Sequence, residues 1–171
     1  MKSVAGFLSL AAPLLSSLVA PVSSTRVVGY YADWTSGILA AKDIPYTKLT
    51  HINYAFGILD AQGNVTLETG TLLDEVVGLA HQNQVQVLLS VGGWTASAQF
   101  SPMVSTLEKR TYTIAAILQH IKIHQLDGID IDWEYPGRMG SLCNVVDKAN
   151  DSPNLLIFLQ ELRAALTAEY P

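Results

Sequence analysis

The sequence has little cysteine and few basic residues. Cys143 is the single cysteine among 171 residues, so the chain cannot close an internal disulfide bridge. Ten Lys and Arg residues stand against fifteen Asp and Glu, the net charge is −5, and the basic residues are scattered. Because phosphate binding needs clustered Lys and Arg, this composition argues against a nucleic-acid partner.

Apolar runs long enough to cross a membrane are also missing. The apolar stretch at residues 7–20 is shorter than the about 20 residues that a bilayer requires. It follows a basic start at Lys2 and precedes small residues, an arrangement typical of a secretory signal peptide. We expect residues 1–24 to be removed by cleavage near Ser24. The mature protein is expected to be secreted and extracellular, with no membrane segment. Cleavage after Ala20 is an alternative, which the following Pro21 makes less attractive.

The chain does contain short apolar runs that are rich in β-branched and aromatic residues. They lie at residues 27–31, 49–56, 85–91 and 128–133, and Gly, Pro or polar clusters bound each of them. Such runs are typical of buried strands. The sequence therefore predicts four strands.

Helical patterns lie between and after these strands. Thr71 can cap a helix that runs to about Gln84, with Asp74 and Glu75 in its first turn. Residues 105–108 form a capping box that opens a second helix, which we expect to end near His124. A third helix is expected from Asn154. Apolar side chains recur at helical spacing in the second helix (Ile114, Ile117, Leu118, Ile121) and in the third (Leu155, Phe158, Leu159, Leu162, Leu166).

The alternation of strands and helices indicates an α/β fold with a parallel sheet. Strands that are apolar on both faces suit a parallel (β/α)8 TIM barrel, which has eight units and typically about 250 residues. About the first four units are present in this chain. We expect residues 25–171 to form the N-terminal half of a barrel domain, apparently truncated, and to fold poorly alone because of an open parallel edge.

Three carboxylates share one face of the fourth predicted strand. Side chains alternate along a strand, so Asp130, Asp132 and Glu134 point to one side and the apolar residues between them to the other. Asp127 has the opposite parity and is interpreted as a strand-entry residue. Mutual repulsion and loss of solvation favour the protonated form of at least one of these acids, as a general acid requires.

Glu134 is the best candidate for that acid, because it lies at the C-terminal end of the strand, where barrel active sites form. An acidic strand end and a metal site made from the same carboxylates are the alternatives. None of the four histidines has a ligand-like spacing to this segment. We therefore expect no metal and no cofactor.

Four segments resemble the signatures of family 18 glycoside hydrolases, the chitinases and their relatives. Residues 127–136 resemble the active-site signature, and residues 90–94 resemble the second. Residues 29–31 and 51–56 are similar to the first two strands of the family. The resemblance covers the chain from about residue 27 to its end, which corresponds to the N-terminal half of the family's catalytic domain.

The resemblance implies retaining hydrolysis of β-1,4-linked N-acetylglucosamine, in chitin or chito-oligosaccharides, without an enzyme nucleophile. In this scheme Glu134 protonates the glycosidic oxygen while the substrate's acetamide attacks the anomeric carbon. Asp132 orients the acetamide and stabilises the positive intermediate. Asp130 shares a proton with Asp132.

Four further residues acquire substrate-binding roles from the same resemblance. Tyr30 and Ser90 are expected to hydrogen-bond Asp130, Trp94 to offer a flat face to a sugar ring, and Tyr135 to line the cleft. Each also has a purely structural interpretation, as a packing aromatic, a core tyrosine or a small residue at a strand end. Phe56 is expected in the core, and Gly92 and Gly93 are expected to serve backbone geometry.

Two other functions stay open at this point. The family's later strands supply further sugar-binding residues that this sequence lacks, which favours a non-catalytic chitin-binding protein or an inactive fragment. An endo-β-N-acetylglucosaminidase shares the strand motif. The intact Glu134 favours an enzyme, and Trp94 favours chitin as its substrate. If complete, the protein is expected to be a monomer.

Overall fold

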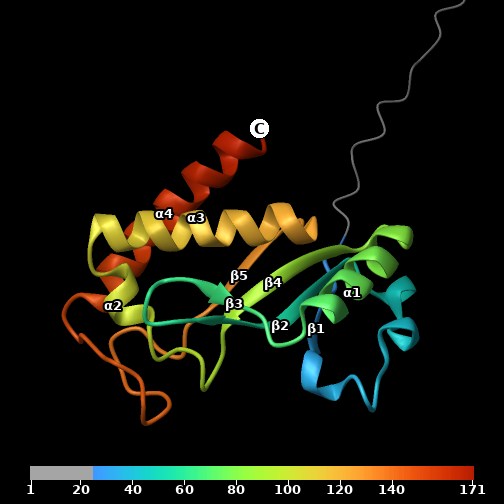
Figure 1. Ribbon diagram of the computed structural model, residues 1–171, viewed down its shortest axis with the longest axis horizontal. Helices are drawn as coiled ribbons and strands as arrows, with labels where there is room; N and C mark the ends of the chain where they lie inside the picture. Colours follow the sequence, from blue (N-terminus) through green and yellow to red (C-terminus); the bar gives the residue numbers. More distant parts are fainter. Residues whose placement is uncertain (1–24) are drawn as a thin grey trace, which may run out of the picture.

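The computed structural model describes residues 25–171 (Figure 1). The predicted signal peptide lies outside these residues, so its cleavage and the domain boundary at residue 24 stay predictions. Within the described part, no helix combines the length and apolar character that crossing a membrane requires.

Four parallel strands form the centre of the molecule. They are β1 (Val28–Ala32), β2 (His51–Leu59), β4 (Gln86–Gly92) and β5 (Gly128–Asp132), paired in the order β1-β2-β4-β5. All four match the predicted strands. The short strand β3 (Val65–Thr66) pairs antiparallel with β2 and was not predicted, because two residues carry no readable alternation.

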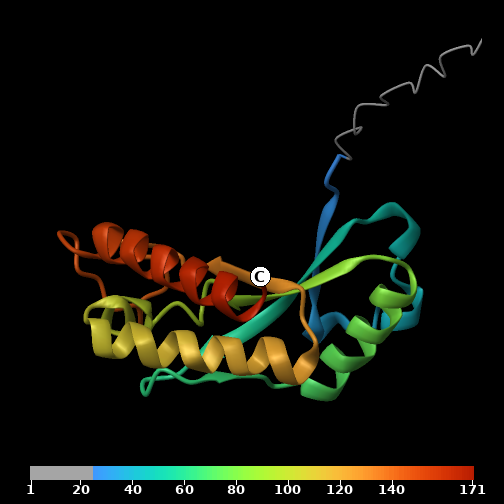
Figure 2. The same cartoon turned by 90° about the horizontal axis from the view of Figure 1, so that it is seen from above.

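The connections place most helices after β2. Three 3₁₀ helices join β1 to β2: η1 (Asp33–Thr35), η2 (Ala41–Asp43) and η3 (Tyr46–Lys48). The α-helices are α1 (Gly70–Gln82), α2 (Phe100–Val104), α3 (Leu107–His124) and α4 (Asp151–Glu169). Helices α3 and α4 run side by side, and α1 lies toward the other end of the molecule (Figure 2).

The predicted start of α1 at Thr71 is wrong. Thr69 is the N-cap residue, no acidic residue lies in the first turn, and Asp74 and Glu75 follow in the second. A tertiary contact explains the earlier start: the Thr69 hydroxyl donates to the Asp33 carboxylate and also lies 2.7 Å from the Tyr54 hydroxyl. The helix ends at Gln82, two residues before the predicted Gln84.

The capping box predicted at residues 105–108 is also wrong. The N-cap of α3 is Thr106, whose Oγ1 accepts the Lys109 N–H at 3.3 Å. The Ser105 hydroxyl instead donates to the Pro102 carbonyl at 2.7 Å, at the end of α2, a helix that was not predicted. The short helix α2 therefore uses the residue that was expected to open α3.

Helix α4 begins at Asp151, three residues before the predicted Asn154. The buried Asp151 carboxylate accepts the N–H groups of Gly137 at 3.1 Å and Asp147 at 2.9 Å. These bonds tie the first turn of the helix to the preceding loop. The start of α4 thus depends on a polar contact that hydrophobic periodicity does not reveal.

The hydrophobic core lies between the sheet and its helices. The predicted apolar face of α3 is confirmed, because Ile114, Ile117 and Ile121 are buried and Leu118 is partly buried. Along the predicted face of α4, Phe158 and Leu162 are buried, whereas Leu159 is exposed. The apolar face of α4 is therefore only half covered.

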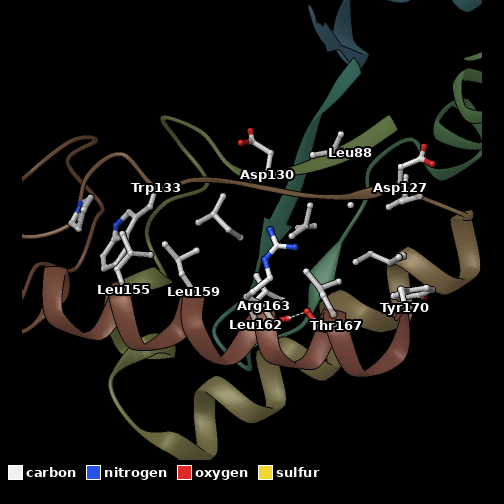
Figure 3. Close-up of a pocket in the computed structure, with 17 residues that line it drawn as sticks. Leu88, Asp127, Asp130, Trp133, Leu155, Leu159, Leu162, Arg163, Thr167 and Tyr170 are labelled. Carbon is white, nitrogen blue, oxygen red and sulfur yellow. Dashed lines mark hydrogen bonds between the residues drawn. The ribbon is translucent and has the colours of Figure 1, made fainter. Parts of the chain in front are cut away.

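A groove of about 940 Å³ separates the apolar side of β5 from α4. Ile129 and Ile131 contribute to one wall, and Leu159 and Arg163 to the other. In Figure 3 the side chains of Leu155 and Leu159 of α4 point toward β5, while Asp130 points away from the helix. The carboxylate row thus projects to the opposite side of β5 from this groove.

Candidate functional site

The carboxylate row has the arrangement that strand alternation predicts. Asp130 and Asp132 lie within β5, and Glu134 follows just beyond its end. Trp133, of opposite parity, is buried and stacks on Phe100 with ring centroids 5.3 Å apart. Packing of Trp133 into the core holds the residues on either side of it toward the carboxylate face.

Asp130 is held by two hydroxyl groups from other strands. Its Oδ2 atom accepts from the Tyr30 hydroxyl of β1 and from the Ser90 hydroxyl of β4, both at 2.8 Å. β1 and β5 are three strand steps apart, or about 14 Å in a flat sheet. The Tyr30 hydroxyl reaches Asp130 because the sheet curls and brings the side chains on its inner face closer together. Asp130 therefore lies on the concave face of the sheet.

Asp132 is the middle carboxylate of the row. Burial raises its pKa above the ordinary 3.8, and the negative charges of Glu134 and then Asp130 raise it further. The sequence predicts that crowding favours the protonated form of at least one of these acids, and the structure places this effect at Asp132. The neutral form of Asp132 can donate a hydrogen bond to a carbonyl oxygen above it.

Two aromatic residues border the row beyond the strand ends. Trp94 is 53% exposed, and its ring meets that of Tyr135 edge-on at 6.4 Å. The Arg138 guanidinium lies 4.0 Å from the Tyr135 ring centroid. A hydrogen bond to Glu134, and then the negative charge of Glu134, raises the pKa of the Tyr135 hydroxyl. The structure therefore brings both aromatics to the same end of the sheet as the carboxylates.

Trp34 is a candidate site residue that sequence reasoning missed. It lies in η1, directly after β1, is 68% exposed, and stacks on Phe56 at 5.9 Å. Both line a small cavity of about 150 Å³, together with Asp33, Glu68 and other residues. The sequence did contain a signal for Trp34, because it lies just after the C-terminal end of a predicted parallel strand, where barrel active sites form. The prediction that Phe56 belongs to the core is wrong, because its ring is partly exposed in this cavity.

Gly92 and Gly93 allow the close approach that the site requires. Their φ angles are 116° and 87°, where side chains are strained. A Cβ atom on Gly92 would lie 2.2 Å from the Asp132 carbonyl oxygen, and one on Gly93 would lie 2.7 Å from the Phe56 ring. The predicted geometric role of both glycines is confirmed.

Asp127 lies at the entry of β5, away from the row, as its parity predicts. Its Oδ2 atom accepts the Val87 N–H at 2.7 Å and lies 2.8 Å from His81 Nε2. These contacts tie the start of β5 to β4 and α1. Among residues 25–171, no group of three or more His, Cys, Asp or Glu side chains is arranged to hold a metal ion.

The fold and the carboxylate row together define the class of protein. The sequence profile described as "Glycosyl hydrolases family 18" matches residues 26–171. The chain belongs to this family, as the resemblance implied.

The similar curated proteins are chitinases and chitinase-like proteins. A "chitinase-like effector" of Moniliophthora perniciosa is 42% identical over 139 residues, which cover 79% of this chain and 32% of that protein. An "Endochitinase" of Manduca sexta is 31% identical in an alignment that covers 92% of this chain and 30% of that protein. The chain thus spans about a third of the length of these relatives.

Solved structures confirm the fold. A chitinase from Rhizomucor miehei superimposes with a TM-score of 0.73 and 34% identity, over 80% of this chain and 42% of that one. The group IV chitinase of Ostrinia furnacalis gives a TM-score of 0.74 and 28% identity, over 84% and 42% respectively. The predicted α/β class and the parallel strands of part of a TIM barrel are therefore confirmed.

Proposed function

We propose that this chain carries the proton-transfer residues of a secreted enzyme that hydrolyses β-1,4-N-acetylglucosamine linkages in chitin or chito-oligosaccharides. The observation that carries the proposal is the row of three carboxylates on the concave face of β5, with Asp130 held by two hydroxyls. The names of the Manduca sexta and Rhizomucor miehei relatives support chitin as the substrate. The segment at residues 1–24 supports secretion.

Each carboxylate has a separate role in the proposed reaction. Glu134, at the open end of the row, protonates the glycosidic oxygen as the bond breaks. The acetamide oxygen of the substrate attacks the anomeric carbon as the leaving group departs, so no enzyme nucleophile is needed. Water then gives its proton to Glu134 and attacks the same carbon, which opens the cyclic intermediate. The two displacements together retain the anomeric configuration. Asp132 orients the acetamide and, once the shared proton has moved to Asp130, stabilises the cationic intermediate by its negative charge.

The environment of Asp130 supports a proton shared with Asp132. Two hydroxyl donors converge on one Asp130 oxygen and hold that carboxylate in place beside Asp132. Burial and the neighbouring charges favour a proton on Asp132. Tyr30 and Ser90 therefore act through Asp130, and they keep the shared proton in reach of Asp132 as it turns toward the substrate.

The exposed aromatic rings suit a sugar chain. Trp94 presents a flat face beside the carboxylates, Tyr135 lines the cleft next to Glu134, and Trp34 extends the aromatic surface toward β1. Aromatic faces bind the apolar side of a sugar ring, and the polar edges of these residues remain available for hydrogen bonds. A neutral polysaccharide also suits a chain whose net charge is −5, since it is not repelled.

A second candidate function is chitin binding without hydrolysis. Two relatives from Moniliophthora species that carry the name "chitinase-like effector" are 42% and 40% identical to this chain, which favours this candidate. The retained Glu134 favours hydrolysis.

The endo-β-N-acetylglucosaminidase alternative predicts release of glycans from glycoproteins in place of chitin cleavage.

Glu134→Gln in the full-length protein tests the proposal. We expect hydrolysis of a chito-oligosaccharide to fall by about 10²–10⁴-fold, because the amide cannot donate the catalytic proton. Binding of the same oligosaccharide, measured by calorimetry, should change little. Glu169→Gln on the exposed end of α4 is the matched control and should retain full turnover.

The outcomes separate the candidates. Comparable turnover in Glu134→Gln and the unchanged protein would rule out Glu134 as the acid. Oligosaccharide binding without turnover in the unchanged protein would favour the non-catalytic candidate. Release of N-glycans from a glycoprotein, without cleavage of chito-oligosaccharides, would favour the endo-β-N-acetylglucosaminidase.

A further inference from the structure

Two buried side chains hold the backbone of Glu134 from opposite sides. Its N–H donates to Ser97 Oγ at 2.8 Å, and its carbonyl oxygen accepts from Asn144 Nδ2 at 2.6 Å. Ser97 is 0% exposed and Asn144 is 7% exposed. Both peptide groups that flank the Glu134 Cα atom are thus anchored by residues that are distant in the sequence.

Ser97 is oriented by its own hydrogen bond. Its hydroxyl donates to the Gly93 carbonyl at 2.8 Å, which leaves a lone pair for the Glu134 N–H. The Gly93 N–H in turn donates to the Asp132 carbonyl at 2.8 Å. Ser97 therefore links the loop after β4 to the end of β5.

Asn144 belongs to the loop between β5 and α4, which packs closely on Glu134. A Cβ atom on Gly140 would lie only 2.1 Å from the Glu134 carbonyl oxygen. The Val145 N–H donates to the Ala98 carbonyl at 3.4 Å, which joins this loop to the one that contains Ser97. The two loops thus enclose the Glu134 backbone.

The position of Glu134 in the chain explains why these contacts are needed. β5 ends at Asp132, so the hydrogen bonds of the strand ladder do not extend to Glu134. Without Ser97 and Asn144, the part-buried N–H and carbonyl groups of Glu134 would lose these hydrogen bonds, and the residue could turn about its backbone. A small rotation there moves the carboxyl group, and a misplacement of about 1 Å can cost about 10²-fold in rate.

We propose that Ser97 and Asn144 are positioning residues, which set the distance of the Glu134 carboxyl from Asp132 and from the glycosidic oxygen. This proposal rests on the proposed function for its effect on catalysis. Ser97 and Asn144 act only through the Glu134 backbone. Their loss should therefore reduce the chemical step more than substrate binding.

Kinetics of Ser97→Ala and Asn144→Leu in the full-length protein provide the first test. We expect kcat for a chito-oligosaccharide to fall by about 10- to 100-fold, with KM changed by less than about threefold. Ser97→Thr keeps the hydroxyl and should recover most of the lost kcat. The control is Ser101→Ala. Ser101 is a buried serine of α2 whose hydroxyl makes no hydrogen bond to Glu134 among the described residues. Its replacement should leave kcat unchanged.

A titration of the Asp132 carboxyl by carbon-detected NMR provides a second test that needs no turnover. Glu134 is one of the groups that raise the pKa of Asp132. If Ser97→Ala lets the Glu134 carboxyl move away, the pKa of Asp132 should fall toward its ordinary value. Ser101→Ala should leave this titration unchanged.

The two tests separate this proposal from the proposed function. If the unchanged protein shows no hydrolysis, the proposed function fails, and the titration still decides whether Ser97 positions Glu134. An unchanged Asp132 titration in Ser97→Ala would overturn the positioning role. A kcat loss that only follows the folded fraction, measured by circular dichroism in the same samples, would also overturn it.

Discussion

β4 and β5 are adjacent parallel strands whose environments differ. They pair in register from Leu88 opposite Gly128 to Gly92 opposite Asp132. In β4 the side chains of Val87, Leu89 and Val91 are fully buried, whereas every residue of β5 is only half-buried. Both strands have branched apolar side chains at alternate positions, so residue type does not explain the difference.

The neighbours of each strand explain it. β4 lies between β2 and β5 and is covered by α1, whereas in the described part β5 pairs with β4 alone. The groove of about 940 Å³ also keeps α4 away from Ile129 and Ile131. Burial of a strand is therefore decided by what packs beside it.

The two faces of β5 differ as well. The face toward α4 is apolar and incompletely packed, while the concave face is polar and held by directional bonds from Tyr30 and Ser90 to Asp130. Hydrogen bonds to a carboxylate need only a few well-placed donors. The carboxylate row can therefore be ordered on a strand whose other face lacks a full set of neighbours.

Truncation of one core residue in each strand tests the comparison most directly. Leu89→Ala in β4 should lower the free energy of unfolding by about 2–5 kcal/mol, because it leaves a cavity among fully buried neighbours. Ile131→Ala in β5 should cost less than half as much, because its side chain already borders the open groove. Urea unfolding of both variants measures the difference. Equal losses would mean that the groove is closed in solution.

Removal of the ion pair between α3 and α4 should have the next largest effect. Glu161 accepts two hydrogen bonds from the buried Arg110 guanidinium, at 2.7 and 3.0 Å. Glu161→Ala should cost about 1.5–3 kcal/mol, because it leaves that charge without its partner. Glu169→Ala on the exposed end of α4 should change the free energy of unfolding by less than about 0.5 kcal/mol. Similar losses in both would show that apolar contacts alone hold α4.

The smallest effect concerns Asp132 and depends on pH. Because its pKa is raised in the folded state, the ionised form opposes folding at neutral pH. Asp132→Asn should therefore raise the free energy of unfolding at pH 7, by less than the Glu161 effect. This gain should shrink as the pH falls through the raised pKa of Asp132, and it should vanish below the ordinary value of 3.8.

Asp60→Asn gives a control of opposite sign. Hydrogen bonds from Asn64 lower the pKa of Asp60, so its ionised form favours folding above the ordinary pKa and loses that contribution as the pH falls. The substitution should therefore destabilise the protein at pH 7, and the loss should disappear in acid. Unfolding of both variants between pH 7 and pH 3 tests the two signs. The same sign in both would contradict the environment described for Asp132.

Strand positions and the carboxylate row could be predicted because they depend on local patterns. Alternation along β5 places Asp130, Asp132 and Glu134 on one face whatever surrounds the strand. The predicted starts of α1 and α3 were less accurate. Thr69 donates a hydrogen bond to Asp33, and Ser105 donates one to Pro102 of α2, and neither contact can be read from helical periodicity. Periodicity describes which face is apolar and carries no information about such contacts.

The sequence alone determined the parallel α/β class, the family signatures and the face that carries the acids, because these follow from residue type and spacing. The tertiary structure decided which acid has the raised pKa, how Trp34 meets Phe56, and which residues hold Glu134. The hydrogen bond from Glu134 to Ser97 spans 37 positions of the chain, and only folding brings the two residues together. A pKa or a hydrogen bond depends on distance in space, which spacing along the chain does not contain.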